Sequence, residues 1–305
     1  MLRVAVVGVG HLGSIHARIY SQLESAQLVA VCDTAPGLAQ KIARQFRCQP
    51  VTDFNALLGT VDAVSIAVPT QHHFPIAKVF LAQGIHALVE KPITQTVEEA
   101  DELLRLSQQT HAILQVGHVE RFNATFQKVR DSLQNPRFIE VHRLAPFQPR
   151  GTEVGVVLDL MIHDIDILLA LVKSPIQRID AVGVKVLTPF EDIANARITF
   201  ANGAVANLTA SRISKDGMRK FRIFQTDTYL SMDLLRQAVD IFRHKNGTIS
   251  HERLAITGEE PLKVELSAFV ESIQQKRLPP VSGQEARKAL AVALEITQQI
   301  HKTHP

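Results

Sequence analysis

A glycine-rich turn between two short apolar segments constrains the fold of this chain more than any other sequence feature. Leu2–Val7 is an apolar, β-branched run typical of a buried parallel strand, and the sequence GVGHLG follows it directly at residues 8–13. A helical pattern then leads to a second apolar run at residues 28–32, which is followed by Asp33, twenty residues beyond Gly13. This order of strand, turn, helix, strand and acid predicts a dinucleotide-binding α/β unit.

The turn residues have separate expected roles in holding a dinucleotide. Gly8 permits the tight turn, Gly10 lets the backbone approach a pyrophosphate, and Gly13 lets the helix pack closely on the strand. Asp33 is expected to accept hydrogen bonds from the adenosine ribose hydroxyls and to repel a 2′-phosphate. It therefore predicts NAD, with a preference for NADP or for both cofactors as the alternative. The turn residues expected to contact NAD are Gly8, Gly10, His11, Leu12 and Gly13.

Composition and charge limit the class of protein. The 305 residues are 46% hydrophobic and 21% charged, and they are enough for two domains. Thirty-three Lys and Arg residues against 30 Asp and Glu residues give a net charge of +3, which does not indicate a nucleic-acid partner. Cys32 and Cys48 show no CxxC spacing, and the 13 histidines form no HExxH motif, so no metal site is predicted. No apolar run has the length of a membrane span, so we expect a soluble, cytoplasmic protein.

Strands and helices alternate as far as residue 118. Apolar runs at residues 62–68, 85–89 and 112–116 are predicted as further parallel strands, and right-handed crossovers would wind about six strands into one open Rossmann sheet. Loops at the carboxyl ends of such strands build the binding site. The loop residues expected to contact the cofactor are Pro69, Thr70, His73, Glu90 and Lys91. We therefore predict an NAD-binding domain over residues 1–118.

The pattern of elements changes beyond residue 118. Helices are predicted at residues 120–133, 153–172, 261–275 and 284–302. Strands are predicted at residues 137–144, 179–187, 194–200, 204–211, 221–226, 229–235 and 239–244, with Asn202-Gly203 as a hairpin turn. These elements predict an α+β domain over residues 119–305 with an open, mostly antiparallel sheet. Its last helix could pack back on the first domain.

The long helix predicted at residues 153–172 is apolar nearly all round, so it is expected to be buried. At about 100° per residue, Asp159, His163 and Asp166 lie on one narrow stripe of this helix. Burying polar groups without partners is costly, so the stripe is expected to face a cavity. Asp159 lies one turn from His163 and can orient its imidazole as a general base. Structural hydrogen bonds to the neighbouring sheet are the alternative.

Lys91 and a set of basic and polar side chains complete the candidate site. Lys91 follows a predicted strand, where its ammonium could relay a proton or polarise an alcohol oxygen. Arginine suits phosphate recognition, and three arginines are expected around the crevice between the domains. For each of these arginines a solvated surface charge is the alternative. The residues expected to bind substrate are Arg121, Asn123, Arg143, Arg150 and His163.

Four motifs in order along the chain resemble those of one protein family. They are the GVGHLG turn, Pro69 with His73, Glu90-Lys91-Pro92, and Asp159 with His163. Their order and spacing resemble the Gfo/Idh/MocA oxidoreductases over nearly the whole chain. This resemblance implies an N-terminal Rossmann domain, a C-terminal α/β domain whose open sheet often forms an oligomer interface, and hydride transfer between a sugar-like alcohol and NAD(P). It also implies that Lys91, Asp159 and His163 are the catalytic residues.

The segments at residues 117–123, 142–150 and 156–166 resemble a branch of that family that acts on nucleotide sugars. This resemblance implies NAD-dependent oxidation of the C3 hydroxyl of a UDP-N-acetylglucosamine-type sugar to the 3-keto sugar, for diamino-sugar lipid A or O-antigen synthesis. A homodimer or homotetramer through the C-terminal sheet is also expected. The alternatives are a dehydrogenase of another sugar or cyclitol, and a regulator that senses NAD without turnover.

Overall fold

The computed structural model describes residues 1–130, 133–149 and 152–303, and the chain divides into two compact units. Unit 1 consists of Met1–Val119 and Glu260–Leu290, and unit 2 consists of Glu120–Glu259 and Ala291–Pro305. The predicted boundary at residue 118 lies next to the first of these limits. None of the described helices is both long and apolar enough to cross a membrane.

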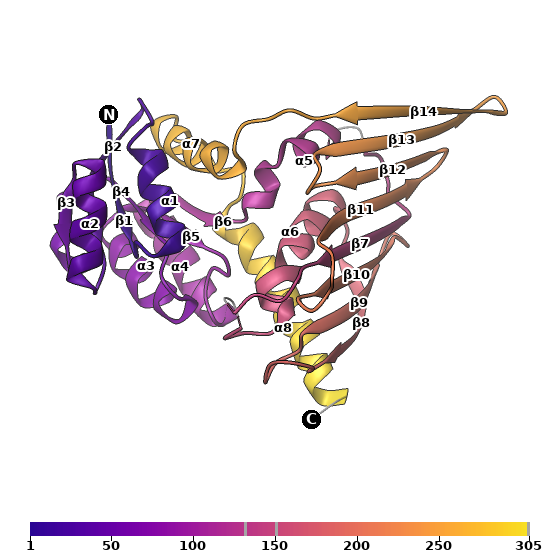
Figure 1. Cartoon of the computed structure of the whole chain (residues 1–305), viewed down its shortest axis with the longest axis horizontal. Helices are drawn as coiled ribbons and strands as arrows, with labels where there is room; N and C mark the ends of the chain where they lie inside the picture. The colour runs from indigo at the N-terminus through magenta and orange to yellow at the C-terminus, as the bar shows by residue number, and fades with distance from the viewer. Residues whose placement is uncertain (131–132, 150–151, 304–305) are drawn as a thin grey trace. The chain divides into compact units, whose positions relative to one another are not determined.

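A six-stranded parallel sheet forms the centre of unit 1 (Figure 1). Its strands are β1 (Leu2–Val7), β2 (Ala26–Cys32), β3 (Gln49–Val51), β4 (Ala63–Ile66), β5 (His86–Glu90) and β6 (Leu114–Gly117). They lie in the order β3-β2-β1-β4-β5-β6, and β1 pairs in parallel with both β2 and β4. The strand order therefore reverses beside β1, which is the switch point where doubly wound sheets bind ligands. The predicted Rossmann sheet is confirmed.

The helices of the first 118 residues follow the strands as the sequence predicts. They are α1 (His11–Tyr20), α2 (Pro36–Phe46), α3 (His73–Ala82) and α4 (Val97–Thr110), with short 3₁₀ turns η1 (Phe54–Leu57) and η2 (Thr70–His72). Thr96 and Glu99 form the predicted capping box at the start of α4, in which each side chain bonds the backbone N–H of the other residue. The strands and α1 share one buried core, which includes Val4, Val6, Ile19, Tyr20 and Val31.

The helix α7 (Pro261–Gln274) belongs to unit 1, where it packs against α1. The prediction that residues 119–305 form the second domain is therefore wrong for α7. The start of α8 (Gly283–Thr303) also belongs to unit 1, which contains residues 283–290, in line with the possibility left open above that this last helix packs back on the first domain. An apolar helix face shows that a helix is buried, but it does not identify the core that it joins. The face of α7 joins the core of unit 1 through Leu262, Leu266, Phe269 and Val270.

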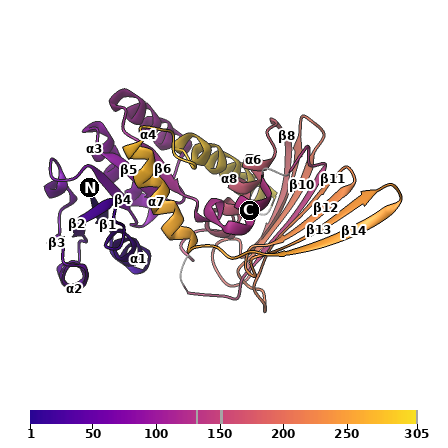
Figure 2. The same ribbon diagram turned by 90° about the horizontal axis from the view of Figure 1, so that it is seen from above.

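An open eight-stranded sheet forms one layer of unit 2. Its strands are β7 (Phe138–Leu144), β8 (Ile176–Val184), β9 (Ile193–Phe200), β10 (Val205–Ser211), β11 (Met218–Gln225), β12 (Thr228–Asp233), β13 (Ala238–Lys245) and β14 (Thr248–Ala255). They lie in the order β14-β13-β12-β11-β7-β10-β9-β8, in which only the pair β7 and β10 is parallel. The helix α6 (Ile162–Leu171) lies over one face of the sheet (Figure 2). The predicted mostly antiparallel sheet is confirmed.

Three elements of unit 2 differ from the prediction. The strand β14 was not predicted, because its residues are almost all exposed and show no apolar alternation. Of the helix predicted at residues 120–133, residues 131 and 132 lie outside the described part of the chain, and the rest is a 3₁₀ turn, η3 (Val119–Phe122), followed by α5 (Ala124–Val129). Asn123 separates the two, and its side chain caps α5 by accepting a hydrogen bond from the Thr125 N–H. The helix predicted at residues 153–172 begins with a π-helical turn, η5 (Val157–Met161), which leads into α6.

Candidate active site

The glycine turn after β1 combines a tight backbone with an open side. Gly8 has φ +83°, a conformation that favours glycine, and a Cβ there would lie 2.7 Å from the carbonyl oxygen of Ala67. A Cβ at Gly13 would lie 1.8 Å from the carbonyl oxygen of Gly8, so a side chain does not fit. At Gly10 no heavy atom of the described residues lies within 4 Å of the Cβ position. The turn therefore has the space that the approach of a pyrophosphate requires.

Asp33 and the start of α1 border this turn. Asp33 Oδ2 accepts a hydrogen bond from the Val9 N–H at 3.0 Å. Gly10 is the N-cap of α1 and has no side chain to bond the first N–H groups of the helix, which can therefore bond an anion. His11 and Leu12, in the first turn of α1, are exposed. These groups fit a dinucleotide, with N–H donors for the pyrophosphate and a carboxylate for the ribose hydroxyls.

Three of the residues predicted to bind the cofactor follow β4, in the segment that leads into α3. Pro69 is exposed and Thr70 is half-buried, whereas His73 is 1% exposed. His73 Nδ1 lies 2.8 Å from the Pro92 carbonyl oxygen, and Nε2 lies 2.8 Å from the Val68 carbonyl oxygen. Burial lowers the pKa of His73, although both carbonyl groups act against this. The imidazole is thus bonded within unit 1, which differs from the direct contact with the cofactor that we predicted.

Glu90, which was also predicted to contact the cofactor, is likewise bonded within unit 1. Its Oε1 lies 3.2 Å from His16 Nε2, and its Oε2 accepts a hydrogen bond from the Lys91 N–H at 3.2 Å. Burial acts to raise the pKa of Glu90, but the hydrogen bond and charge of His16, together with Lys91, hold it below its ordinary value. Lys91 is half-buried. Sequence reasoning missed His16, whose one signal is a histidine within the apolar pattern of α1.

Four charged side chains form a mostly buried ion-pair network in unit 2. Arg143 Nε and Nη2 donate to the carboxylate of Asp164 at 2.7–3.0 Å, and its Nη1 donates to Glu120 Oε1 at 3.0 Å. Arg219 Nη1 donates to the same oxygen of Glu120 at 2.9 Å. Burial acts to lower the pKa of Arg143, but Asp164 and Glu120 raise it above its ordinary value. Burial raises the pKa of Asp164, although Arg143 acts against the rise.

These contacts bear on the residues predicted to bind substrate. Arg143 is 3% exposed and its guanidinium bonds two carboxylates, so the structure gives it an internal role in place of the predicted contact with substrate. Asn123 is 5% exposed and caps α5. Arg121 Nη1 donates at 3.3 Å to Asp166 Oδ1, the third residue of the predicted polar stripe. Arg150 lies outside the described residues. Sequence spacing does not reveal which arginines are paired with buried acids.

Asp159 and His163 lie in consecutive turns where η5 joins α6, and both are half-buried. Single π-helical turns within helices are frequent at functional sites. Glu191 packs at the start of this segment, since a Cβ at Gly155 would lie 1.8 Å from Glu191 Oε1. The same oxygen accepts a hydrogen bond from the Val157 N–H at 3.4 Å. Gly155 thus allows a buried carboxylate to bond the first turn of the helix that holds the candidate base.

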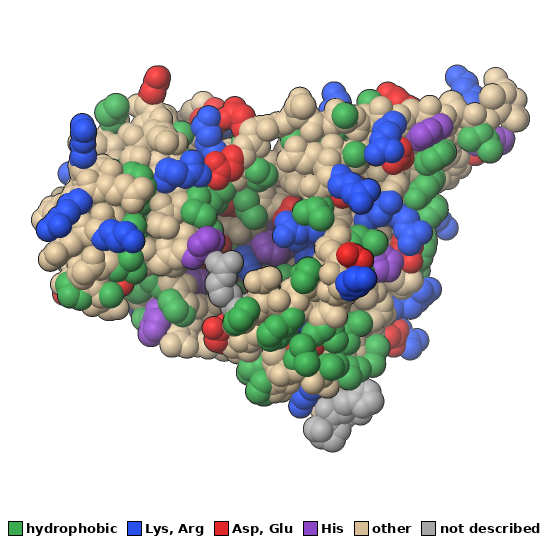
Figure 3. All heavy atoms as spheres, viewed as in Figure 1, with side chains coloured by type: hydrophobic (Ala, Val, Ile, Leu, Met, Phe, Trp, Pro, Cys, Tyr) green, Lys and Arg blue, Asp and Glu red, His purple; other side chains and the backbone are tan. Residues whose placement is uncertain are grey.

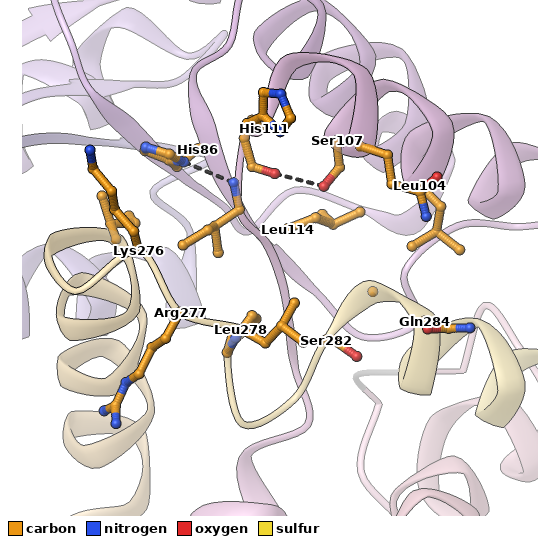
Figure 4. Close-up of a pocket in the computed structure, with 16 residues that line it drawn as sticks. His86, Leu104, Ser107, His111, Leu114, Lys276, Arg277, Leu278, Ser282 and Gln284 are labelled. Atoms are coloured by element: carbon orange, nitrogen blue, oxygen red, sulfur yellow. Dashed lines mark hydrogen bonds between the residues drawn. The ribbon is translucent and has the colours of Figure 1, made fainter.

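A separate cavity of about 690 Å³ lies in unit 1 at the amino ends of β5 and β6 (Figure 4). It is lined by His86 at the start of β5, by Leu114 at the start of β6, and by Lys276 and Arg277 beyond α7. His86 Nδ1 accepts a hydrogen bond from the Ile113 N–H at 2.8 Å, and burial lowers the pKa of His86. The residues predicted to bind NAD follow the carboxyl ends of the strands, so this cavity lies away from the predicted cofactor site.

Comparisons with known proteins match nearly the whole chain. A family model described as "Oxidoreductase family, NAD-binding Rossmann fold" matches residues 2–118, and one described as "GFO/IDH/MocA C-terminal domain" matches residues 115–231. The UDP-N-acetylglucosamine 3-dehydrogenase of Acidithiobacillus ferrooxidans is 38% identical over 302 residues, which cover 97% of this chain and 96% of that protein. Its solved structure matches with a TM-score of 0.94 over 99% of this chain and 98% of that chain.

More distant relatives include dehydrogenases named for inositols. The myo-inositol 2-dehydrogenase of Thermotoga maritima is 23% identical over 312 residues, which cover 95% of this chain and 93% of that protein. The scyllo-inositol dehydrogenase of Lactobacillus casei, solved with NAD(H) and scyllo-inositol bound, matches with a TM-score of 0.84. That match has 20% identity and covers 99% of this chain and 98% of that chain, so it shows a common fold.

Proposed function

Because this chain belongs to the Gfo/Idh/MocA family of oxidoreductases, we propose that it oxidises the C3 hydroxyl of a UDP-N-acetylglucosamine-type nucleotide sugar to the 3-keto sugar. The chain is a dehydrogenase with an NAD-binding Rossmann domain. The main support for this substrate is the 38% identity, over 97% of the chain, to a UDP-N-acetylglucosamine 3-dehydrogenase. The relatives named for inositols favour another sugar or a cyclitol as the second candidate.

Three side chains supply the acid–base chemistry in this proposal. NAD, held at the glycine turn, supplies the acceptor for the hydride that leaves C3. His163 takes the proton of the C3 hydroxyl, and Asp159 orients the imidazole and stabilises its positive charge. The ammonium of Lys91 polarises the oxygen of the same hydroxyl. The alcohol thus loses one hydride and one proton, which leaves the ketone.

The position of Asp33 supports NAD over NADP. Its carboxylate is held at the glycine turn by the Val9 N–H. A carboxylate at this position accepts hydrogen bonds from the ribose hydroxyls and repels a 2′-phosphate. Turnover with NAD is therefore expected to exceed turnover with NADP.

Arg121 and Arg150 are our candidates for binding the diphosphate of the substrate. Arg143 is left out, because Asp164 and Glu120 already bond its guanidinium. Arg121 bonds Asp166 through Nη1, and a guanidinium has five N–H donors, enough for a carboxylate and a phosphate together. For Arg150 the support is the sequence resemblance alone.

Our candidate oligomer interface is the face of the eight-stranded sheet on which Phe224, Tyr229 and Phe242 lie. Aromatic rings stack across four strands on this face, from Phe224 to Tyr229, Phe242 and His251, with centroid distances of 4.7, 5.5 and 4.3 Å. Val182 of β8, on the same face, is 45% exposed. Figure 3 shows hydrophobic side chains that gather at the end of unit 2 where Figure 1 labels β8 and α8. The row of stacked rings is only half-buried at Phe224, Tyr229 and Phe242, and exposed apolar patches mark protein contacts, so we propose a homodimer or homotetramer through this sheet.

We place the reaction in the cytoplasm, ahead of an amination step. A 3-keto sugar is a substrate for an aminotransferase, which would give a diamino sugar for lipid A or O-antigen synthesis. Neither Cys32 nor Cys48 forms a disulfide in the described part of the chain, which is compatible with a reducing compartment.

A substrate panel tests the proposed function. The protein is incubated with NAD and with UDP-N-acetylglucosamine, other UDP-sugars, free sugars or inositols, and NADH is measured by its absorbance. We expect UDP-N-acetylglucosamine to give the fastest formation of NADH. Turnover on free sugars or inositols alone would favour the second candidate, and NAD binding without turnover on any compound would indicate a sensor of NAD.

A further inference from the structure

A series of buried polar contacts ends at the backbone of Lys91. Ser65 Oγ of β4 lies 2.8 Å from His16 Nδ1 of α1, and His16 Nε2 lies 3.2 Å from Glu90 Oε1 of β5. The other carboxylate oxygen of Glu90 accepts the hydrogen bond from the Lys91 N–H at 3.2 Å. Ser65 and His16 are 0% exposed, and Glu90 is 8% exposed. These contacts therefore link α1, β4 and β5 to the backbone N–H of Lys91.

The neighbouring strand β6 fixes the Glu90 carboxylate further. A Cβ at Gly117 would lie 2.7–2.8 Å from the carboxylate atoms, so the carboxylate lies directly against the Gly117 backbone. A buried carboxylate is destabilising unless it has polar partners, and His16 Nε2 and the Lys91 N–H supply them. Apolar residues of similar volume often replace a buried ion pair without loss of stability. A carboxylate held in this buried position therefore points to a function for Glu90 besides stability.

The residue after Lys91 is anchored from the other side. The Pro92 carbonyl oxygen lies 2.8 Å from His73 Nδ1, and Nε2 of the same imidazole lies 2.8 Å from the Val68 carbonyl oxygen. A neutral imidazole has one N–H, so His73 donates to one of these carbonyl groups at a time. His73 is buried at the start of α3, which is a rigid support. Lys91 thus lies between two anchored peptide groups.

We propose that Glu90, His16 and His73 are positioning residues that hold Lys91 in place for its action on the substrate hydroxyl. This inference rests on the role proposed above for Lys91. The Lys91 side chain is long and flexible, and it acts only within hydrogen-bond reach of the oxygen that it polarises. A displacement of about 1 Å can lower a rate about 100-fold, so the loss of an anchor is expected to lower kcat. The anchors act on Lys91 and not on the glycine turn, so the affinity for NAD is expected to change little.

Glu90→Gln is the main test variant, because glutamine keeps the size of glutamate and removes its charge. We expect kcat to fall about 10- to 100-fold while the dissociation constant for NAD stays within about threefold of the wild-type value. His16→Gln is expected to give a loss of similar size, and it serves as the test if Glu90→Gln does not fold. Because both substitutions break the same contact, the double variant is expected to lose little more than either single variant. His73→Gln tests the second anchor with the same two measurements.

Tyr20→Phe is a matched control for structural damage. Tyr20 is 0% exposed and lies one turn beyond His16 on α1. Removal of its hydroxyl perturbs the same buried region but keeps the contact between Glu90 and Lys91. We expect an unchanged kcat, because the contacts of His16 and Glu90 stay in place.

Lys91→Ala separates a failure of this inference from a failure of the proposed function. Wild-type turnover in Lys91→Ala would overturn the role of Lys91 and the positioning role together. If Lys91→Ala is inactive while Glu90→Gln and His16→Gln keep the wild-type kcat, the positioning role alone is overturned. Additive losses in the double variant, or an equal loss of kcat in Tyr20→Phe, would also overturn it, since structural damage would then explain the effect.

Discussion

Asp33 Oδ2 accepts a hydrogen bond of 3.0 Å from the Val9 N–H, so the acid that follows β2 is fixed against the glycine turn that follows β1. Its Oδ1 accepts a second hydrogen bond, of 2.9 Å, from the Ala35 N–H. The chain's own backbone therefore orients the carboxylate before a dinucleotide arrives. Such preorganisation lowers the entropic cost of binding.

Asp33→Ser is expected to weaken the preference for NAD. Serine removes the charge that repels a 2′-phosphate, so the ratio of kcat/KM with NAD to kcat/KM with NADP is expected to fall at least about tenfold. Steady-state kinetics with both cofactors measure this ratio. Asp101→Ser is the control, because Asp101 pairs with Arg287 on the surface of unit 1. An unchanged ratio in Asp33→Ser would contradict the assignment of Asp33 to the ribose.

Gly13→Ala and Gly10→Ala are expected to differ in stability. A Cβ at position 13 would lie 1.8 Å from the Gly8 carbonyl oxygen, so Gly13→Ala is expected to lower the free energy of unfolding by about 2 kcal/mol or more. Gly10→Ala meets open space and is expected to stay within about 0.5 kcal/mol of the wild type, while its added methyl group weakens NAD binding. Urea unfolding and titration with NAD measure the two effects. Wild-type stability in Gly13→Ala would contradict the close packing of the turn.

Arg143→Met is expected to destabilise unit 2 far more than Arg219→Met. Loss of the Arg143 guanidinium leaves the Asp164 carboxylate buried without this partner, which costs about 3–5 kcal/mol for a buried ion pair. The Arg219 side chain is 48% exposed, so its pairing with Glu120 is expected to contribute at most about 1 kcal/mol. Equilibrium urea unfolding compares the two variants. Equal losses would show that the buried network does not hold this unit together.

The protein is expected to lose stability in acid because Glu120 becomes protonated there. Burial acts to raise the pKa of Glu120, but Arg143 and Arg219 hold it below its ordinary value of 4.5. A carboxyl whose pKa is lower in the folded chain stabilises the fold above the ordinary pKa, and this stabilisation is lost as the pH falls through the folded-state pKa. The free energy of unfolding should therefore fall with pH below about 4.5, and less steeply in Glu120→Gln. The same slope in both proteins would contradict the pairing.

Local signals made the first 118 residues the most predictable part of the chain. The GVGHLG turn, the capping box of Thr96 with Glu99, and the apolar strands depend on neighbours within a few residues, and the structure confirms each element. The hairpin at Asn202-Gly203 between β9 and β10 was predictable for the same reason. The sequence alone is sufficient to predict an element whose conformation depends on residues only a few positions apart.

Pairings between distant residues were not predictable. Arg143 and Asp164 lie 21 positions apart, and only the fold brings them together, so a predicted substrate ligand proves to be bonded within the protein. The pairing of His16 with Glu90 crosses from a helix to a strand and leaves no mark in the spacing of either residue. The extra residue of the π-helical turn η5 also has no sequence signal in the apolar run that contains it.

Transfer of the hydrogen at C3 tests the proposed reaction most directly. The substrate is UDP-N-acetylglucosamine with deuterium at C3, and the NADH formed is examined by mass spectrometry. We predict NADH that carries the deuterium, and we predict that Lys91→Ala and His163→Ala bind NAD but form almost none of this product. NADH without deuterium would show that another carbon is oxidised, and the absence of NADH despite NAD binding would contradict a dehydrogenase of this sugar.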